Sequence, residues 1–354
     1  MKKILILNRR CIRHPERGGA EIYTYELAKA LIGHGAAVDW FCARPKYLKR
    51  VEKIDGIKFI RRGNAFTTHF YGFFYALQKR DCLIIDEFNG LGFLTFFMKN
   101  SILLIHQLYD HFWTVEFGPI GYPFRVVERM ILSFYRKKPT ITVSVSTHED
   151  LKRLGFKDVT IIHNGLDLIP SNDTLKKEEN LTLIFLGRLK KTKNPEEAIK
   201  AFLLVHRSIP NAKLWIIGDG PLTKRLEKRY GKDEGIHFFG FVSDQEKYEL
   251  LRRAHFLLVP SLTEGWGQVV IQANAVGTPA IGFEVKGLQD SIKNGQTGFL
   301  VKDYKEMSLK AMALWKDHDQ YVAICKKALN WSNHFSWEKT KEEFIRFTAN
   351  RGIR

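Results

Sequence analysis

Residues 259–277 read VPSLTEGWGQVVIQANAVG: the end of an apolar strand, then a glycine-containing turn, then an apolar helix from about Val269. The first amides of a helix have no partner within the helix, and its dipole adds roughly half a positive charge there. Glycines such as Gly265 and Gly267 let the backbone approach a bound group closely. A strand, turn and helix in this order predict an anion-binding site.

Glu264 lies inside this segment and changes the chemistry that it predicts. A carboxylate beside a bound phosphate would repel it. Glu264 therefore indicates a ligand that carries other polar groups next to its phosphate, such as sugar hydroxyls. The segment alone suggests a nucleotide sugar.

Short apolar runs recur along the chain, with helical patterns between them. They cover residues 4–7, 37–42, 82–85, 102–105, 141–145 and 159–162, and then 181–186, 213–217, 237–239, 255–259, 280–283 and 298–301. Apolar strands that alternate with helices indicate parallel sheets covered on both faces. Two such series predict an α/β protein with two doubly wound, Rossmann-like domains. Ligands of this fold bind beyond the carboxyl ends of the strands, so we expect the site in a central cleft between facing domains.

The length of 354 residues also favours two domains. The break falls at residues 169–180, IPSNDTLKKEEN, which are polar, charged and contain a proline. We therefore predict domains at 1–168 and 181–335. A last helical segment, 336–354, is expected to cross back and pack on the first domain.

Composition narrows the class of protein. The formal charge is +18, which favours polyanions of any kind, but no zinc-finger, RRM or helix-turn-helix pattern supports nucleic acid as a partner. The four cysteines form no CxxC pair and are expected to be reduced, buried thiols. The start MKKILILNRR has only four consecutive apolar residues, and no apolar segment reaches 18 residues. We expect a cytoplasmic protein.

Several polar residues stand directly after predicted strands. Arg188 and Lys193 follow the run 181–186, where two cations would neutralise a diphosphate; a solvated lysine run is the alternative. His106 follows the run 102–105 in the same way. Gly18 and Gly19 precede a helix from about residue 20, but GxGxxG and an acid for the ribose are missing, which argues against a dinucleotide site.

These features occur together in one known family. The motifs, in order, are GGAE at 18–21, His106, HNGLD at 163–167, GRLxxxK at 187–193, IIGDGP at 216–221, FFGFV at 238–242 and PSLTEGWGQVVIQANAVGTP at 260–279. In this order and spacing the chain resembles the retaining GT-B glycosyltransferases of family 4, also called glycosyl transferases group 1. The resemblance runs from residue 1 to about residue 301.

The resemblance implies a nucleotide-diphosphate sugar as donor and co-substrate. It assigns catalytic roles to His106, Arg188, Lys193 and Glu264, with the two cations on the leaving diphosphate and Glu264 on the sugar hydroxyls. It places donor contacts at Gly18, Gly19, Gly187, Phe241, Val242, Gly267, Gln268, Val269 and Gln272. It implies transfer with retention, and no obligatory cofactor or metal is expected.

Gln272 departs from the family pattern. The family has a second acid eight positions after Glu264, which accepts hydrogen bonds from the ribose hydroxyls, and this chain has Gln272 there. Glutamine keeps one carbonyl acceptor but loses the charge. Two alternatives therefore stay open beside a transferase: a sugar-nucleotide epimerase of the same fold, and a non-catalytic nucleotide-sugar binding protein.

The segment 59–75, FIRRGNAFTTHFYGFFY, interleaves basic and aromatic residues. Such a surface, together with the net charge, predicts peripheral contact with anionic membrane at the inner face of the cell membrane. A lipid-linked or cell-surface glycan is then the expected acceptor. The alternative is that most of these rings belong to the core of a strand and a helix.

Overall fold

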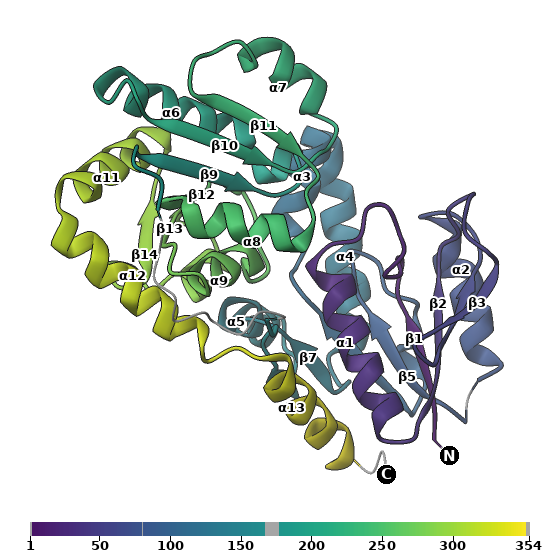
Figure 1. Cartoon of the computed structure of the whole chain (residues 1–354). Helices are drawn as coiled ribbons and strands as arrows, with labels where there is room; N and C mark the ends of the chain where they lie inside the picture. The colour runs from purple at the N-terminus through teal and green to yellow at the C-terminus, as the bar shows by residue number, and fades with distance from the viewer. Residues whose placement is uncertain (1, 80, 167–176, 352–354) are drawn as a thin grey trace. The chain divides into compact units, whose positions relative to one another are not determined.

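The computed structural model describes residues 2–79, 81–166 and 177–351 (Figure 1). The chain forms two compact units, of which unit 1 is Met1–Gly165 with Phe335–Arg354 and unit 2 is Leu166–His334. Most of the predicted linker, 169–180, lies outside the described residues. Each unit is an α/β layer structure of its own.

Unit 1 contains, in its described part, an eight-stranded sheet in the order β3-β4-β2-β1-β5-β6-β7-β8. Its strands are β1 (Lys3–Leu7), β2 (Ala37–Cys42), β3 (Val51–Ile54), β4 (Ile57–Arg61), β5 (Leu83–Glu87), β6 (Ser101–Ile105), β7 (Thr140–Thr142) and β8 (Val159–Ile161). Its helices are α1 (Gly19–Gly33), α2 (Thr67–Leu77), η1 (Thr95–Phe97), α3 (Asp110–Phe117), η2 (Gly118–Gly121), α4 (Tyr122–Tyr135), α5 (Val145–Arg153) and α13 (Trp337–Ala349). The order of strands reverses between β1 and β5, which makes their carboxyl ends a switch point where ligands bind in such sheets.

One strand of this sheet runs against the expectation of purely parallel sheets. β3 pairs with β4 antiparallel, and the two are joined by Asp55 and Gly56, which both have positive φ. An Asp-Gly pair between short strands is a common hairpin turn because it tolerates this backbone geometry. The predicted run 141–145 also divides, because Ser144 caps α5 immediately after β7 ends.

Unit 2 contains, among its described residues, a six-stranded parallel sheet in the order β11-β10-β9-β12-β13-β14. The strands are β9 (Thr182–Leu186), β10 (Lys213–Ile217), β11 (Ile236–Gly240), β12 (Phe256–Val259), β13 (Ala280–Phe283) and β14 (Gly298–Val301). The helices are η3 (Lys191–Lys193), α6 (Pro195–Ser208), α7 (Thr223–Tyr230), α8 (Asp244–Arg253), α9 (Gln268–Asn274), α10 (Leu288–Ser291), α11 (Tyr304–Lys316) and α12 (His318–Ser332). The order reverses between β9 and β12, which makes their carboxyl ends the switch point of this unit.

Both faces of the unit 2 sheet are buried, which explains its apolar strands. Leu183 and Phe185 pack into a core shared with α6, α11 and α12, while Ile184 between them packs into a second core with α8 and α9. Alternate residues of a strand point to opposite faces, so a strand covered on both sides must be apolar throughout. This burial holds the polar strand ends at one edge.

The last helix, α13, packs against α1 within unit 1. Lys341 forms an ion pair with Glu26 at 2.8 Å, and the Trp337 ring lies 6.3 Å from the Tyr23 ring. Gly165 allows this contact, because a Cβ there would lie 2.4 Å from the Trp337 amide nitrogen. The carboxyl-terminal helix therefore closes the face of the first sheet on which α1 lies.

Two smaller expectations concern thiols and membrane spans. Cys11, Cys42, Cys82 and Cys325 are free and buried, as predicted. Among the described residues, no helix is both long and apolar enough to span a lipid bilayer.

Candidate functional site

Two of the predicted site residues meet at the switch point of unit 2. Lys193 comes from η3, after β9, and Glu264 from the loop after β12; their side chains form an ion pair. Ser261 Oγ also donates to Glu264 Oε1 at 2.9 Å. The Leu262 amide donates to the Thr192 carbonyl at 2.9 Å and ties the two loops together. The chain thus holds a cation and a carboxylate side by side where ligands of this fold bind.

Arg188 adds a second cation to the same strand end. It is half-buried, and its charge contributes, after hydrogen bonds from Thr223 and the Gly220 amide, to lowering the pKa of Asp219. The backbone here is closely packed, because a Cβ at Gly218 would lie 2.1 Å from the Gly187 carbonyl oxygen. Close approach of these two turns places Arg188 between the ends of β9 and β10.

The segment 259–277 folds largely as expected. α9 begins at Gln268, one residue before the predicted start, and its seven residues end at Asn274. Gly267 precedes it with φ +86°, and a Cβ there would lie 2.8 Å from both Leu288 Cδ2 and Ser291 Oγ. Only glycine fits this crowded, left-handed position. Gln268 and Gln272 stand one helical turn apart on α9, so they share one side of it.

The residues after β11 complete the predicted set in unit 2. The Gly218 amide donates to the Gly240 carbonyl at 2.7 Å, which joins the ends of β10 and β11. Phe241 follows with 82% of its surface exposed within the described chain, and Val242 is half-buried. The predicted base contact is through the backbone of these two residues, which directly follow the end of β11, and it stays a prediction.

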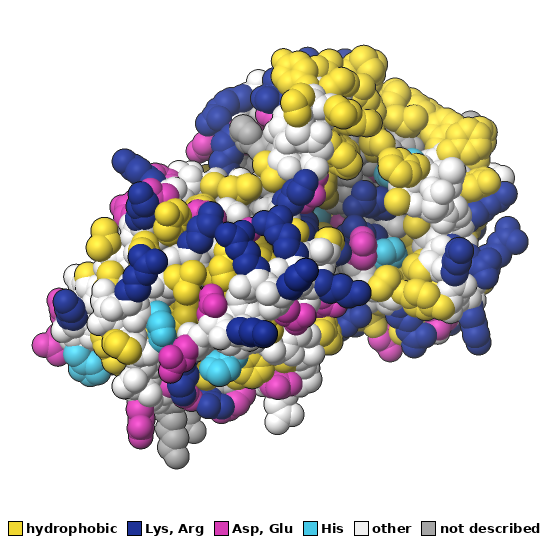
Figure 2. Space-filling model, turned by 90° about the horizontal axis from the view of Figure 1, so that it is seen from above, with side chains coloured by type: hydrophobic (Ala, Val, Ile, Leu, Met, Phe, Trp, Pro, Cys, Tyr) yellow, Lys and Arg dark blue, Asp and Glu magenta, His cyan; other side chains and the backbone are white. Residues whose placement is uncertain are grey.

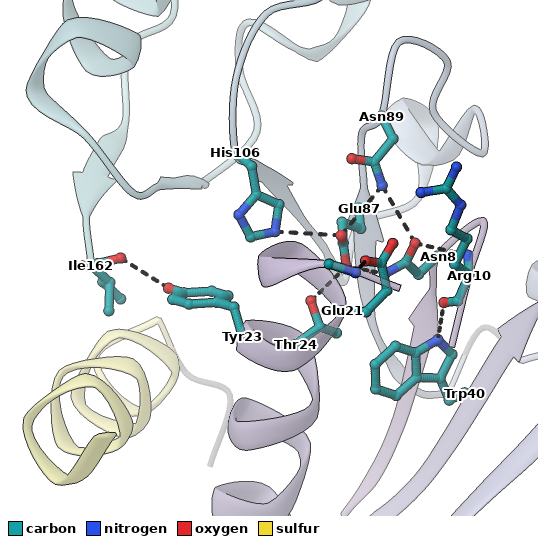
Figure 3. A network of polar contacts seen from close by, with 11 residues as sticks. Asn8, Arg10, Glu21, Tyr23, Thr24, Trp40, Glu87, Asn89, His106 and Ile162 are labelled. Carbon is teal, nitrogen blue, oxygen red and sulfur yellow. Dashed lines mark hydrogen bonds and ion pairs between the residues drawn. The ribbon is translucent and has the colours of Figure 1, made fainter. Parts of the chain in front are cut away.

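His106 lies at the switch point of unit 1, inside a polar network (Figure 3). Its Nε2 is 3.4 Å from Glu87 Oε1, and its ring meets the Tyr23 ring edge to face at 5.3 Å. Glu87 is fully buried at the end of β5, where Oε2 accepts from Asn8 Nδ2 at 2.5 Å and from Thr24 Oγ1 at 2.6 Å. The histidine side chain therefore rests on a buried carboxylate.

Gly18 and Gly19 stand at the start of α1, as predicted. The helix begins at Gly19, one residue before its expected start. The Gly18 amide donates to Glu21 Oε2 at 2.6 Å, so this amide is used by the protein itself. Burial, and then the charge of nearby Glu87, raise the pKa of Glu21. The glycine turn is thus held by its own helix through a capping interaction.

The predicted residues therefore fall into two groups, one at the carboxyl ends of the strands of each sheet. Unit 1 carries Gly18, Gly19 and His106; unit 2 carries Gly187, Arg188, Lys193, Phe241, Val242, Glu264, Gly267, Gln268, Val269 and Gln272. That the two groups meet in a cleft stays a prediction. Within residues 2–79, 81–166 and 177–351, no cluster of three or more His, Cys, Asp or Glu side chains could hold a metal ion.

Comparisons with known proteins agree with this geometry. The family described as glycosyl transferases group 1 matches residues 170–331, and glycosyltransferase family 4 matches residues 17–169. The D-inositol 3-phosphate glycosyltransferase of Corynebacterium glutamicum is 30% identical over 92% of this chain and 90% of that protein. The chain belongs to the group 1 glycosyl transferases. A glycogen synthase of Mycobacterium tuberculosis is 31% identical, but the match spans only 45% of this chain and 40% of that protein.

Solved structures show that this glycosyltransferase has the GT-B fold. A sucrose-phosphate synthase from Thermosynechococcus elongatus superposes over all of both chains with a TM-score of 0.82 at 19% identity. The Anabaena protein HepE, in complex with UDP-glucose, gives 0.74 at 18% identity over 99% of this chain and 100% of that chain. The predicted fold class and family are confirmed.

Sequence reasoning missed part of the site of this glycosyltransferase. Glu87 and Asn8 were not singled out, although Asn8 directly follows the run 4–7, as His106 follows its own run, and Glu87 comes two residues after the run 82–85. Thr24 carried no signal, because its place on α1 matters only through its contact with Glu87. A search for polar residues at the ends of β1 and β5, the two strands beside the switch point, would have revealed Asn8 and Glu87.

Proposed function

We propose that the protein transfers a sugar, with retention, from a nucleotide-diphosphate sugar to a hydroxyl acceptor. The observation that carries this proposal is the pairing of Lys193 with Glu264 at the switch point of unit 2. A cation and an acid side by side match a ligand that joins a diphosphate to a sugar. The diphosphate would pair with Lys193 and a sugar hydroxyl would donate to Glu264, so each side chain would have a ligand partner of its own.

Arg188 and Lys193 have the leading role in the proposed chemistry. The bond between the anomeric carbon and the diphosphate oxygen breaks, and negative charge grows on the leaving diphosphate. Fixed cations aimed at that charge lower the barrier. The acceptor oxygen then bonds to the same face of the sugar, and its proton passes to the leaving phosphate. Glu264 accepts hydrogen bonds from the donor sugar.

The proposal needs neither a metal ion nor another cofactor, because the two side chains supply the positive charge. Gln272 would contact the ribose through its side-chain carbonyl and Phe241 with Val242 would line the base. HepE is similar in fold and was solved in complex with UDP-glucose, so UDP-sugars are the first donors to try.

Donor binding offers a direct test. A ligand that binds only the folded state raises the melting temperature by mass action. We expect one class among UDP-, GDP- and ADP-sugars to raise it, and transfer with that donor to depend on an added acceptor and to survive a chelator. Sugar release or inversion without acceptor would favour the epimerase, and binding without any turnover would favour the non-catalytic alternative.

We also propose that unit 1 docks on an anionic bilayer through a continuous apolar surface. Rings connect α2 to α4 through η1: Phe74 to Phe73 at 5.3 Å, Phe73 to Phe97 at 6.0 Å, Phe97 to Phe96 at 5.5 Å and Phe96 to Phe134 at 5.1 Å. We name the exposed part the aromatic surface; it comprises Phe66, Phe70, Phe74, Phe97, Val126, Met130 and Phe134. Figure 2 shows broad groups of hydrophobic side chains at the surface, with lysine and arginine beside them.

The aromatic surface is wider than the segment 59–75 that predicted it. α2 carries no Asp, Glu, Lys or Arg, and Val126, Met130 and Phe134 recur every fourth residue of α4 with more than half of each exposed. One predicted member was wrong: Arg61 is fully buried, because it pairs with Glu52 at 2.9 Å.

Charge favours a lipid surface as the occupant. Arg62, shortly before α2, and Lys99, shortly after η1, are exposed. Three more exposed cations lie on or just after α4: Arg129, Arg136 and Lys137. Apolar side chains bordered by cations match a bilayer with anionic head groups, to which each basic residue adds about 1 kcal/mol. A peripheral membrane enzyme would meet a lipid-linked acceptor there.

Replacing Met130 and Phe134 together by glutamate should weaken vesicle binding by roughly 10²-fold, since each buried side chain contributes about 1.5–3 kcal/mol. The measurement is flotation with phosphatidylcholine vesicles, with and without phosphatidylglycerol. Leu309→Glu, at an apolar position of unit 2 that is 63% exposed, is the matched control. Equal flotation of wild type and double variant, or none by wild type, would contradict the proposal.

A further inference from the structure

Glu87 has no part in the proposed transfer, yet polar side chains from several elements converge on it at the switch point of unit 1 (Figure 3). It is fully buried at the end of β5. Four groups surround its two oxygens: Asn8 and Thr24 on Oε2, and Asn89 at 3.3 Å with His106 at 3.4 Å on Oε1. Asn8, Thr24 and Asn89 donate hydrogen bonds to the carboxylate, and His106 lies within ion-pair distance of it.

The orientation of each amide around Glu87 is set by another contact. The Arg10 amide donates to Asn8 Oδ1 at 3.1 Å, which turns Asn8 Nδ2 toward Glu87. Asn89 Nδ2 lies between Asn8 Oδ1, at 3.4 Å, and Glu87 Oε1, so it must be the donor as well. Asn8, Thr24 and Asn89 therefore all donate to Glu87, and the carboxylate acts only as an acceptor.

The same logic determines the proton of His106. Its Nε2 is buried and makes no hydrogen bond among the described residues; the polar group that it faces, at an ion-pair distance of 3.4 Å, is Glu87 Oε1. An unprotonated Nε2 would direct its lone pair at a carboxylate oxygen, which is repulsive. The neutral ring therefore carries its proton on Nε2, and the tautomer of a histidine is set in this way by the partner of one nitrogen.

We infer that Glu87 is a positioning residue: it holds His106 in the Nε2–H tautomer, so that Nδ1 presents a lone pair to a hydroxyl of the sugar substrate. The contact with the substrate rests on the proposed function, whereas the tautomer does not. Tyr23 supports the arrangement, because its ring meets that of His106 at 87° and its hydroxyl donates to the Ile162 carbonyl at 3.0 Å. The ring is thus held from two sides.

The tautomer is measured by ¹⁵N NMR of the full chain labelled at histidine, at a pH well above the ordinary histidine pKa of about 6.5. The His106 signals are identified by their loss in His106→Gln. We expect the proton on Nε2 in wild type and on Nδ1 in Glu87→Gln, whose amide donates where the carboxylate accepted. An Nδ1–H ring in wild type overturns the inference even if the variant does not fold.

Asp86→Asn is the matched control. Asp86 is the adjacent buried acid on β5, but it accepts from the Phe93 amide, Thr95 and Tyr135 instead, on the opposite side of the strand. Asp86→Asn should leave the His106 tautomer unchanged, although it disturbs the packing around β5 as much as Glu87→Gln does. If both variants shift the tautomer, or neither does, Glu87 has no specific role.

Turnover measurements separate this inference from the proposed function. With the donor identified by melting temperature, Glu87→Gln should lower turnover by about 10- to 100-fold, as loss of a residue that orients a functional group does. In a His106→Gln background the same change should have little further effect, since it acts through that ring. No turnover in wild type refutes the proposed function and leaves the tautomer result standing.

Discussion

Lys193→Ala is expected to lower turnover by roughly 10²- to 10⁴-fold, which corresponds to a loss of about 3–5 kcal/mol of transition-state stabilisation. The lysine supplies a fixed positive charge where the leaving diphosphate develops its negative charge. Its side chain is 26% exposed and pairs with Glu264, so it is held in place but open to a ligand. Steady-state transfer kinetics with the donor found by melting temperature measure the effect.

Folding should survive this change. Ser261 still donates to Glu264 after the lysine is removed, so the carboxylate keeps one hydrogen bond. The matched control is Lys191→Ala, which removes an exposed lysine from the same short helix and should leave turnover within about twofold of wild type, as surface changes usually do. Equal losses in both variants would mean that general charge, rather than Lys193, draws in the donor.

Glu264→Gln is expected to lower turnover by roughly 10- to 150-fold. A hydrogen bond to a charged group contributes about 1.5–3 kcal/mol, and the amide can accept from fewer sugar hydroxyls than the carboxylate. The change also releases Lys193 from its ion pair. Binding of the sugar nucleotide should therefore weaken, while binding of the nucleoside diphosphate alone should stay equal or become tighter.

That contrast between two ligands is the decisive measurement. Melting temperatures of wild type and variant are compared with the sugar nucleotide and with the matching diphosphate, and Glu284→Gln, at an exposed position after β13, is the control. If Glu264→Gln weakened both ligands equally, Glu264 would act on the loop rather than on the sugar.

Most of the architecture could be predicted from short-range patterns. Strands such as β9 and β12 are apolar throughout because both faces are buried, and a run of this kind is visible in the sequence without any knowledge of partners. The order of cations, acid and glycines along the chain also pointed to Arg188, Lys193 and Glu264 before any contact was known.

Other features depended on partners that are distant in sequence. Arg61 was expected at a surface, but it is buried because it pairs with Glu52 across the β3–β4 hairpin and donates to the Lys49 carbonyl at 3.0 Å. The exposed face of α4 was not predicted, because exposure depends on what covers a helix. The amide of Gly18 was expected to contact ligand, yet Glu21 already accepts from it.

Periodicity and ordered motifs are properties of the chain, so they sufficed to predict the family, the two α/β units and a donor site at residues 259–277. Only the tertiary structure reveals that Lys193 and Glu264, 71 positions apart, form one ion pair, and that Glu87, which accepts from Asn8 and Thr24, faces His106. Strand order brings such residues together, and strand order follows from how whole sheets bury their faces.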